Sequence, residues 1–197
     1  MKRKNERIWT TIGSILFICL MTYLAYWYGS TCNQVYLGGV KIYSRSNRVN
    51  DIKDTILMVL KEEPKWRFIP LFLISCVLHG LEYDKRRYKG IVHLVCLSAL
   101  IIISAQFGYK HYNPVREPRE MINVHIIMQG VMGLLYAIAY NISQTYAFKS
   151  LMKKRLSTLQ PLSLSNALCF SHITGLLTAI SVHLITNISL IIRYTFS

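Results

Sequence analysis

The stretch IVHLVCLSALIIISAQFGY, at residues 91–109, runs for about 19 residues without a charged side chain. An α-helix rises about 1.5 Å per residue, so a segment of this length crosses most of a hydrocarbon core about 30 Å thick. Charged residues stand just outside it, at Lys89 and Lys110. The pattern predicts a transmembrane helix over 91–109.

Four similar apolar segments accompany it, and together they predict five spans, at about 8–28, 68–83, 91–109, 124–148 and 170–192. Overall composition agrees, because 52% of the 197 residues are hydrophobic and only 16% are charged, which is more apolar than a typical soluble domain. We predict an all-α fold, a polytopic membrane helix bundle in which residues 1–197 form a single membrane domain. The segment at 68–83 is the shortest, so an alternative with four spans, in which this segment only enters the membrane, stays open.

Basic residues indicate how the chain is oriented. They concentrate at 1–7, 84–90 and 149–169, beside the ends of the apolar segments. Cytoplasmic loops carry an excess of Lys and Arg, so we expect a cytoplasmic N-terminus and an exterior C-terminus, in a bacterial inner membrane. The first segment is too long for a signal peptide and lacks a cleavage site, which predicts an uncleaved anchor. The net charge of +14 is then explained by lipid headgroups, and no nucleic-acid partner is expected.

The longest segment between predicted spans is the exterior loop 29–67. Residues 34–44 form two short β-type halves around Gly38-Gly39, which predicts a hairpin. A helix capped by Asn50 or Asp51 is expected to follow. Its apolar stripe would contain Ile52, Ile56, Val59 and Leu60. Such a helix either lies on the membrane or docks an exterior partner.

The five cysteines include no Cys-x-x-Cys pair, so neither a redox pair nor a zinc knuckle is predicted. Cys32 alone falls in the exterior loop, where an impermeant thiol reagent is expected to reach it.

Polar groups inside a bilayer are costly, so they are candidates for function. The intramembrane candidates are His79, Glu82 and His93. Glu82 also has Arg86 four residues later, an ordinary helical ion pair. Histidines on adjacent helices are one way to bind haem, but no accompanying ligand set is visible. We therefore predict no cofactor, no metal site and no catalytic residue.

Small residues recur along the last two predicted spans, a pattern that lets helices approach closely. These positions, with one histidine among them, form a predicted packing or functional face: Gly130, Gly133, Ala137, Gly175, Ala179 and His183. Packing within the bundle is the simpler interpretation, and an oligomer interface or substrate path is the alternative.

The sequence contains no nucleophile elbow, zinc-protease motif, phosphate-binding loop or dinucleotide fingerprint. Its small, basic, multi-span layout resembles many bacterial inner-membrane proteins and, in architecture only, the membrane immunity proteins against pore-forming bacteriocins, which usually have fewer spans. The predicted function is non-enzymatic. It consists of protein–protein contact in the lipid bilayer, as an accessory subunit or immunity-type protein, with a membrane-protein partner or by self-association. The alternatives are a redox or transport component that uses the intramembrane histidines, and a pore-forming oligomer.

Overall fold

The computed structural model describes residues 2–37, 48–80, 89–112, 115, 119–157 and 163–196. These residues form helices and short turns, and no strand occurs among them. The helices are α1 (Lys2–Leu37), α2 (Arg48–Glu63), the π-helix η2 (Pro64–Phe68), α3 (Ile69–Gly80), α4 (Lys89–Lys110), α5 (Met121–Ser157) and α6 (Leu164–Phe196). The all-helical fold class is therefore confirmed.

Three of these helices are long and apolar enough to cross a membrane. The qualifying segments are Thr11–Cys32 in α1, Ile122–Lys153 in α5 and Leu164–Arg193 in α6. They overlap the first, fourth and fifth predicted spans. In α4 the apolar part that qualifies by composition, Leu94–Lys110, is shorter. By helix length and composition, the chain is an integral membrane protein.

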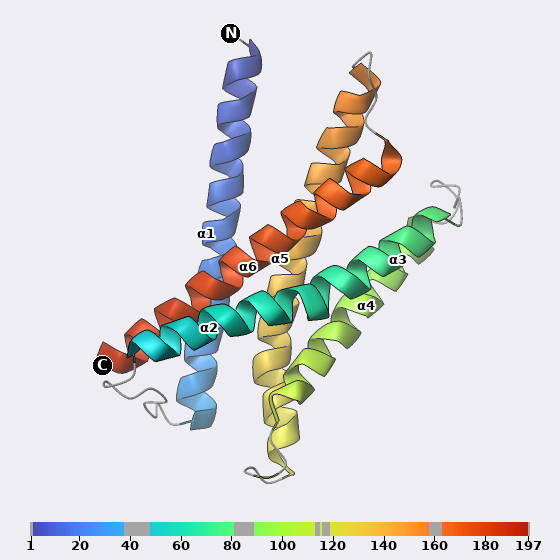
Figure 1. Ribbon diagram of the computed structural model, residues 1–197. Coiled ribbons are helices and arrows are strands. Elements are labelled where there is room, and N and C mark those ends of the chain that lie inside the picture. The colour runs from blue at the N-terminus through green and yellow to red at the C-terminus, as the bar shows by residue number, and fades with distance from the viewer. Residues whose placement is uncertain are drawn as a thin grey trace.

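Helix α5 occupies the centre of the bundle, in contact with α1, α4 and α6 (Figure 1). Helices α2, η2 and α3 follow one another along one continuous line, and this line packs on α6 through α2 and η2 and on α4 through α3 and η2. The N-terminus and the end of α5 lie at the upper end of the view, whereas the end of α1 and the start of α5 lie at the lower end (Figure 1).

Two clusters of buried side chains hold the helices together. The first joins α1, α5 and α6 through Met21, Ala25, Met132, Tyr136, Ala139 and Val182. The second joins α3, α4, α5 and α6 through Leu71, Leu100, Ile103, Ala137, Tyr140 and Ala179. Outward positions are equally apolar, as Leu16 and Leu94 show with 64% exposure each. An apolar exterior around an apolar core is what a lipid environment favours.

The second predicted span is not a separate short helix. Its residues continue a helix that begins at Arg48, and the join is the π-helix Pro64–Phe68, where the Ile69 N–H donates to the Pro64 carbonyl five residues back. Pro70 lacks an N–H and crowds the carbonyl four residues before it. Adding a wide π turn there lets the helix continue past the proline. The helical segment that contains the second predicted span therefore begins well before residue 68.

The exterior loop prediction is also wrong over its first part. Residues 34–37 belong to α1, so the first half of the predicted hairpin is helical, while residues 38–44 lie outside the described residues. Cys32 is in α1 and is buried. The expectation that an impermeant reagent would reach Cys32 is therefore contradicted.

Helix α2 buries only part of its predicted apolar stripe, and its buried face also contains polar residues. Thr55, Val59 and Glu63 recur every four residues and are buried, whereas Ile56 and Leu60 are exposed. The face that is buried packs on α6. In a lipid environment apolar side chains gain nothing by leaving the exterior, so the polar groups turn inward to find partners.

Glycines set the closest helix contacts. A Cβ at Gly108 would lie 2.8 Å from backbone atoms of Gly130, His125 and Ile126, so α4 and α5 meet backbone to backbone here. A Cβ at Gly175 would lie 2.9 Å from the Tyr140 carbonyl oxygen, which places α6 equally close to α5.

Candidate functional site

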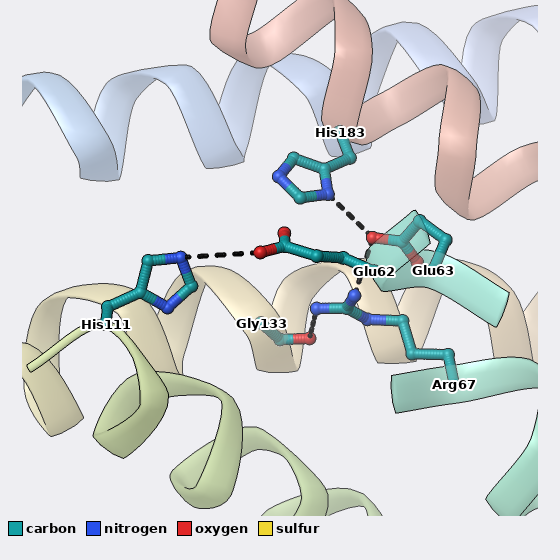
Figure 2. Close-up of polar contacts among 6 residues, drawn as sticks. All are labelled: Glu62, Glu63, Arg67, His111, Gly133 and His183. Atoms are coloured by element: carbon teal, nitrogen blue, oxygen red, sulfur yellow. Dashed lines mark hydrogen bonds and ion pairs between the residues drawn. The ribbon is translucent and has the colours of Figure 1, made fainter. Parts of the chain in front are cut away.

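A buried ion pair lies between α2, η2 and α6. The Arg67 Nη1 donates to Glu63 Oε1 at 2.6 Å, and His183 Nδ1 lies 2.7 Å from the same oxygen (Figure 2). The exposed side-chain fractions are 0% for Glu63, 1% for Arg67 and 4% for His183. A carboxylate only accepts hydrogen bonds, so Nδ1 of His183 carries a proton and donates it.

The Arg67 guanidinium is surrounded by α4 and α5. Its Nη2 donates to the Gly133 carbonyl oxygen at 3.3 Å, and its central carbon lies 4.7 Å from the Phe107 ring centre and 5.3 Å from that of Tyr136. Aromatic faces attract a cation, and more strongly when water is excluded. The Tyr136 ring also stacks on His183, with centres 4.2 Å apart.

These charges lie deep within the helices that bury them. His183 is ten residues from the end of the apolar segment at Arg193, and Gly133 is eleven residues from its start at Ile122. At about 1.5 Å per residue, each is about 15 Å from that end. Glu63 and Arg67 are therefore enclosed by helices α4, α5 and α6.

Glu62 and His111 form a second pair beside the first (Figure 2). The Oε1 of Glu62 is 3.9 Å from Nε2 of His111. The other ring nitrogen, Nδ1, is 2.8 Å from the Phe107 carbonyl oxygen. Because a carbonyl oxygen only accepts, Nδ1 must be the protonated nitrogen, and a neutral His111 then presents a lone pair at Nε2.

His111 stands just past the last residue of α4, outside the candidate spans. Burial lowers the pKa of His111 below its ordinary value, an effect that the hydrogen bond to the Phe107 carbonyl opposes. The imidazole is thus kept neutral near pH 7. When Glu62 is ionised, its oxygen and the neutral Nε2 are both acceptors, so a separation of 3.9 Å suits a donor that bridges the two, such as one water molecule.

Several polar atoms of the site are buried without a protein hydrogen-bond partner among the described residues. They are Glu62 Oε2, Glu63 Oε2 and Arg67 Nε. Most buried polar atoms in proteins are hydrogen-bonded, so such a concentration calls for an explanation, and a site for water or substrate is one. Within the described part of the chain, no three His, Cys, Asp or Glu side chains are arranged to bind one metal ion.

The predicted packing face is buried at every position: Gly130, Gly133, Ala137, Gly175, Ala179 and His183. Gly130 and Gly133 face α4, and a Cβ at Gly133 would lie 2.8 Å from Cδ1 of Phe107 and 3.3 Å from Nη2 of Arg67. This face therefore contributes Gly133 and His183 to the charged site.

The other intramembrane candidates are not part of it. Glu82 lies outside the described residues. His79 and His93 lie in α3 and α4, and their side chains are not among those described. The prediction for these three residues stays a prediction.

A further buried cluster joins α5 and α6 away from the ion pairs. The Tyr140 hydroxyl and His172 Nδ1 are 2.6 Å apart, and Gln144 Nε2 donates to Ser171 Oγ at 3.2 Å. The Phe72 ring of α3 meets the His172 ring edge-on, with centres 5.2 Å apart. These bonds hold the helices in register.

The sequence does not reveal the charged site, because Glu62, Glu63 and Arg67 precede the second predicted span. The sequence does contain one signal for the site, which is the spacing of its residues. Glu63 and Arg67 are four residues apart, as are Phe107 and His111, so each pair lies on one helix face. No family model, no curated protein and no solved structure gives a significant match to this chain.

Proposed function

We propose that this protein is a membrane-embedded hydrolase that uses Glu62 and His111 to activate water. One observation carries the proposal. Two hydrogen-bond acceptors, Glu62 Oε1 and the neutral His111 Nε2, face each other at 3.9 Å beside a buried Glu63–Arg67–His183 cluster. A water molecule that donates one hydrogen bond to each acceptor is held with its oxygen lone pairs directed away from them.

The reaction that this arrangement favours is hydrolysis of an acyl bond. The water oxygen attacks the carbonyl carbon, its proton passes to Glu62, and the carbonyl electron pair moves onto the carbonyl oxygen. When the tetrahedral intermediate collapses, the bond to the leaving nitrogen or oxygen breaks and the leaving group takes the proton from Glu62. The products are a carboxylic acid and an amine or an alcohol.

The neighbouring cluster supports this chemistry electrostatically. Glu63 accepts from both Arg67 and His183, which fixes the orientation of the imidazole much as a buried carboxylate orients a catalytic histidine. Arg67 is a permanent positive charge in a site of low dielectric, where it stabilises negative charge that develops on a reacting carbonyl oxygen.

The surroundings of the site favour a substrate that already resides in the bilayer. The cluster lies about 15 Å from the ends of the α5 and α6 apolar segments, and the outward positions of the helices are apolar. A membrane-spanning peptide and a phospholipid both place acyl bonds within reach of such a site. These two substrate classes are separated by experiment.

The test uses the purified full chain, reconstituted in phospholipid vesicles with a library of single-span peptides, in water labelled with oxygen-18. Hydrolysis places the heavy isotope in a new carboxyl group, which mass spectrometry locates either on a shortened peptide or on a released fatty acid. We expect labelled product with the wild type and loss of about 100-fold or more with Glu62→Gln, the usual scale of one acid–base group.

The control is Glu120→Gln, the same change at an exposed acid. It should retain wild-type turnover. Labelled product of equal amount from the wild type and from Glu62→Gln would refute the proposal. So would the absence of labelled peptide and labelled fatty acid from a correctly folded wild type.

A finer topology accompanies this function. We propose five crossings in a bacterial inner membrane, with a cytoplasmic N-terminus and with α2, η2 and α3 together forming the second crossing. In support, the basic stretches at 1–7, 84–90 and 149–169 adjoin helix ends that alternate along the chain, as cytoplasmic segments do.

The non-enzymatic function expected from the sequence, contact with a membrane-protein partner, stays a prediction. It gains weight if the labelled-water experiment yields no product while a stoichiometric partner co-purifies in mild detergent. The transport, redox and pore-forming alternatives stay predictions on the same terms.

A further inference from the structure

A groove opens between α1, α5 and α6, away from the charged site. It has a volume of about 340 Å³, and its lining includes Gly13, Ser14 and Phe17 of α1, Ile142 and Tyr146 of α5, and Thr178 of α6. The charged cluster instead lies where α2, η2, α4 and α5 meet the other side of α6. The groove is therefore a separate feature of the molecule.

The groove lies toward the basic end of the bundle. Gly13 and Ser14 are near the start of the apolar segment of α1, and Tyr146 is near the end of that of α5. The N-terminus of α1 and the end of α5 lie at the same, upper end of the view in Figure 1. Residues 2–7 add four basic residues to that end of α1.

Two lysines continue the lining stripe of α5 beyond the groove. Ile142, Tyr146, Lys149 and Lys153 are spaced i, i+4, i+7 and i+11, which places them on one face of the helix. Both lysines are exposed. An apolar groove that leads to a pair of cations matches a molecule with an apolar tail and an anionic head.

A single acyl chain is a narrower occupant than a protein helix, which is about 10 Å across with its side chains. At Gly13 an added Cβ would meet nothing within 4 Å. The space beside Gly13 is therefore open, and an acyl chain can enter it.

We propose that the groove between α1, α5 and α6 binds an acyl chain of an anionic phospholipid, whose phosphate is bound by Lys149 and Lys153. The inference does not depend on hydrolysis at the charged site. A phospholipid fits two features together: an apolar chain for the mostly apolar lining, and a negative phosphate for the lysine pair.

The experiment is native mass spectrometry of the detergent-purified full chain, titrated with phosphatidylglycerol or with phosphatidylcholine. We expect the anionic lipid to bind more tightly. Lys149→Gln with Lys153→Gln should weaken phosphatidylglycerol binding about thirtyfold, because each cation near a lipid surface contributes a few-fold in affinity. Gly13→Leu adds a side chain to the groove at a position where a Cβ meets nothing within 4 Å, and it should reduce binding of both lipids.

The matched controls are Lys53→Gln with Lys110→Gln, which remove two exposed lysines elsewhere, and Cys19→Leu, at an exposed position of α1 outside the groove. They should bind both lipids as the wild type does. Unchanged lipid binding by the Gly13 and lysine variants would overturn the proposal. Equal affinity for the two lipids would overturn the proposed preference for an anionic headgroup. A change of oligomeric state in Gly13→Leu without loss of lipid would identify a second protein chain as the occupant and overturn it as well.

Discussion

Replacing Arg67 by leucine should destabilise the fold strongly. The change removes a guanidinium that is 1% exposed and donates to Glu63 and to the Gly133 carbonyl oxygen. Glu63, which is fully buried, is then left with His183 as its one described hydrogen-bond donor. The dominant cost is an uncompensated negative charge away from water.

Breaking a buried pair from one side costs about 3–5 kcal/mol, whereas replacing both partners by apolar residues is often close to neutral. We therefore expect about 4 kcal/mol for Arg67→Leu and a similar value for Glu63→Leu. The double variant still leaves His183 and the Gly133 carbonyl oxygen without their partners, which costs about 1–3 kcal/mol. It should thus be more stable than either single variant.

The assay is thermal unfolding of the purified chain in mild detergent, followed by the fluorescence of its three tryptophans. A loss of 4 kcal/mol corresponds to a fall of about 8–16 °C in Tm for a chain of this size. Losses that simply add in the double variant would refute the reasoning, because they would show that Glu63 and Arg67 do not compensate each other in a dry interior.

Three further predictions concern packing, topology and the second polar cluster. Gly108→Ala should lower stability by about 1–3 kcal/mol, because its Cβ would lie 2.8 Å from backbone atoms of α5, which cannot move locally. Gly13→Ala should raise stability by up to about 1 kcal/mol, because its Cβ would meet nothing within 4 Å. Thermal unfolding of the two variants tests both expectations. In a variant whose native cysteines are replaced, Arg119→Cys should react with an impermeant thiol reagent added to intact cells, whereas Lys153→Cys should react only after lysis. Both positions are exposed, and the proposed topology places them on opposite faces of the membrane. The reverse pattern would contradict a cytoplasmic N-terminus. Tyr140→Phe should cost about 1–2 kcal/mol in thermal unfolding by removing a buried hydrogen bond of 2.6 Å, and an unchanged Tm would show that this bond contributes nothing.

Long apolar periodic segments were predictable because the signal is local. A run of about 20 residues without charge has no stable alternative to a helix in lipid, since every backbone group must be hydrogen-bonded within the segment. The three candidate spans in α1, α5 and α6 follow from this constraint alone. Small residues at Gly133 and Gly175 likewise predict close helix contact, because they let backbones approach.

The helical extension before the second predicted span, from Arg48 to Phe68, could not be placed from the sequence because its charged residues depend on tertiary partners. Charged residues such as Glu63 and Arg67 normally exclude a segment from a bilayer. Here Glu63 finds His183, which is 120 residues away, and Arg67 finds the Gly133 carbonyl oxygen and two aromatic rings. These partners offset much of the desolvation cost, and a hydropathy scan along the chain contains no information about them.

By itself, then, the sequence determined an all-helical membrane protein with apolar segments and the small residues that pack them, because hydrophobic length and helix spacing are properties of neighbouring residues. The tertiary structure alone decided which polar residues meet. Glu62 and Glu63 looked exterior, and His111 and His183 were two histidines among six. Burying a charge requires a partner of opposite charge or a hydrogen-bond donor within a few ångströms, and only the packing of α2, η2, α4, α5 and α6 brings those partners together.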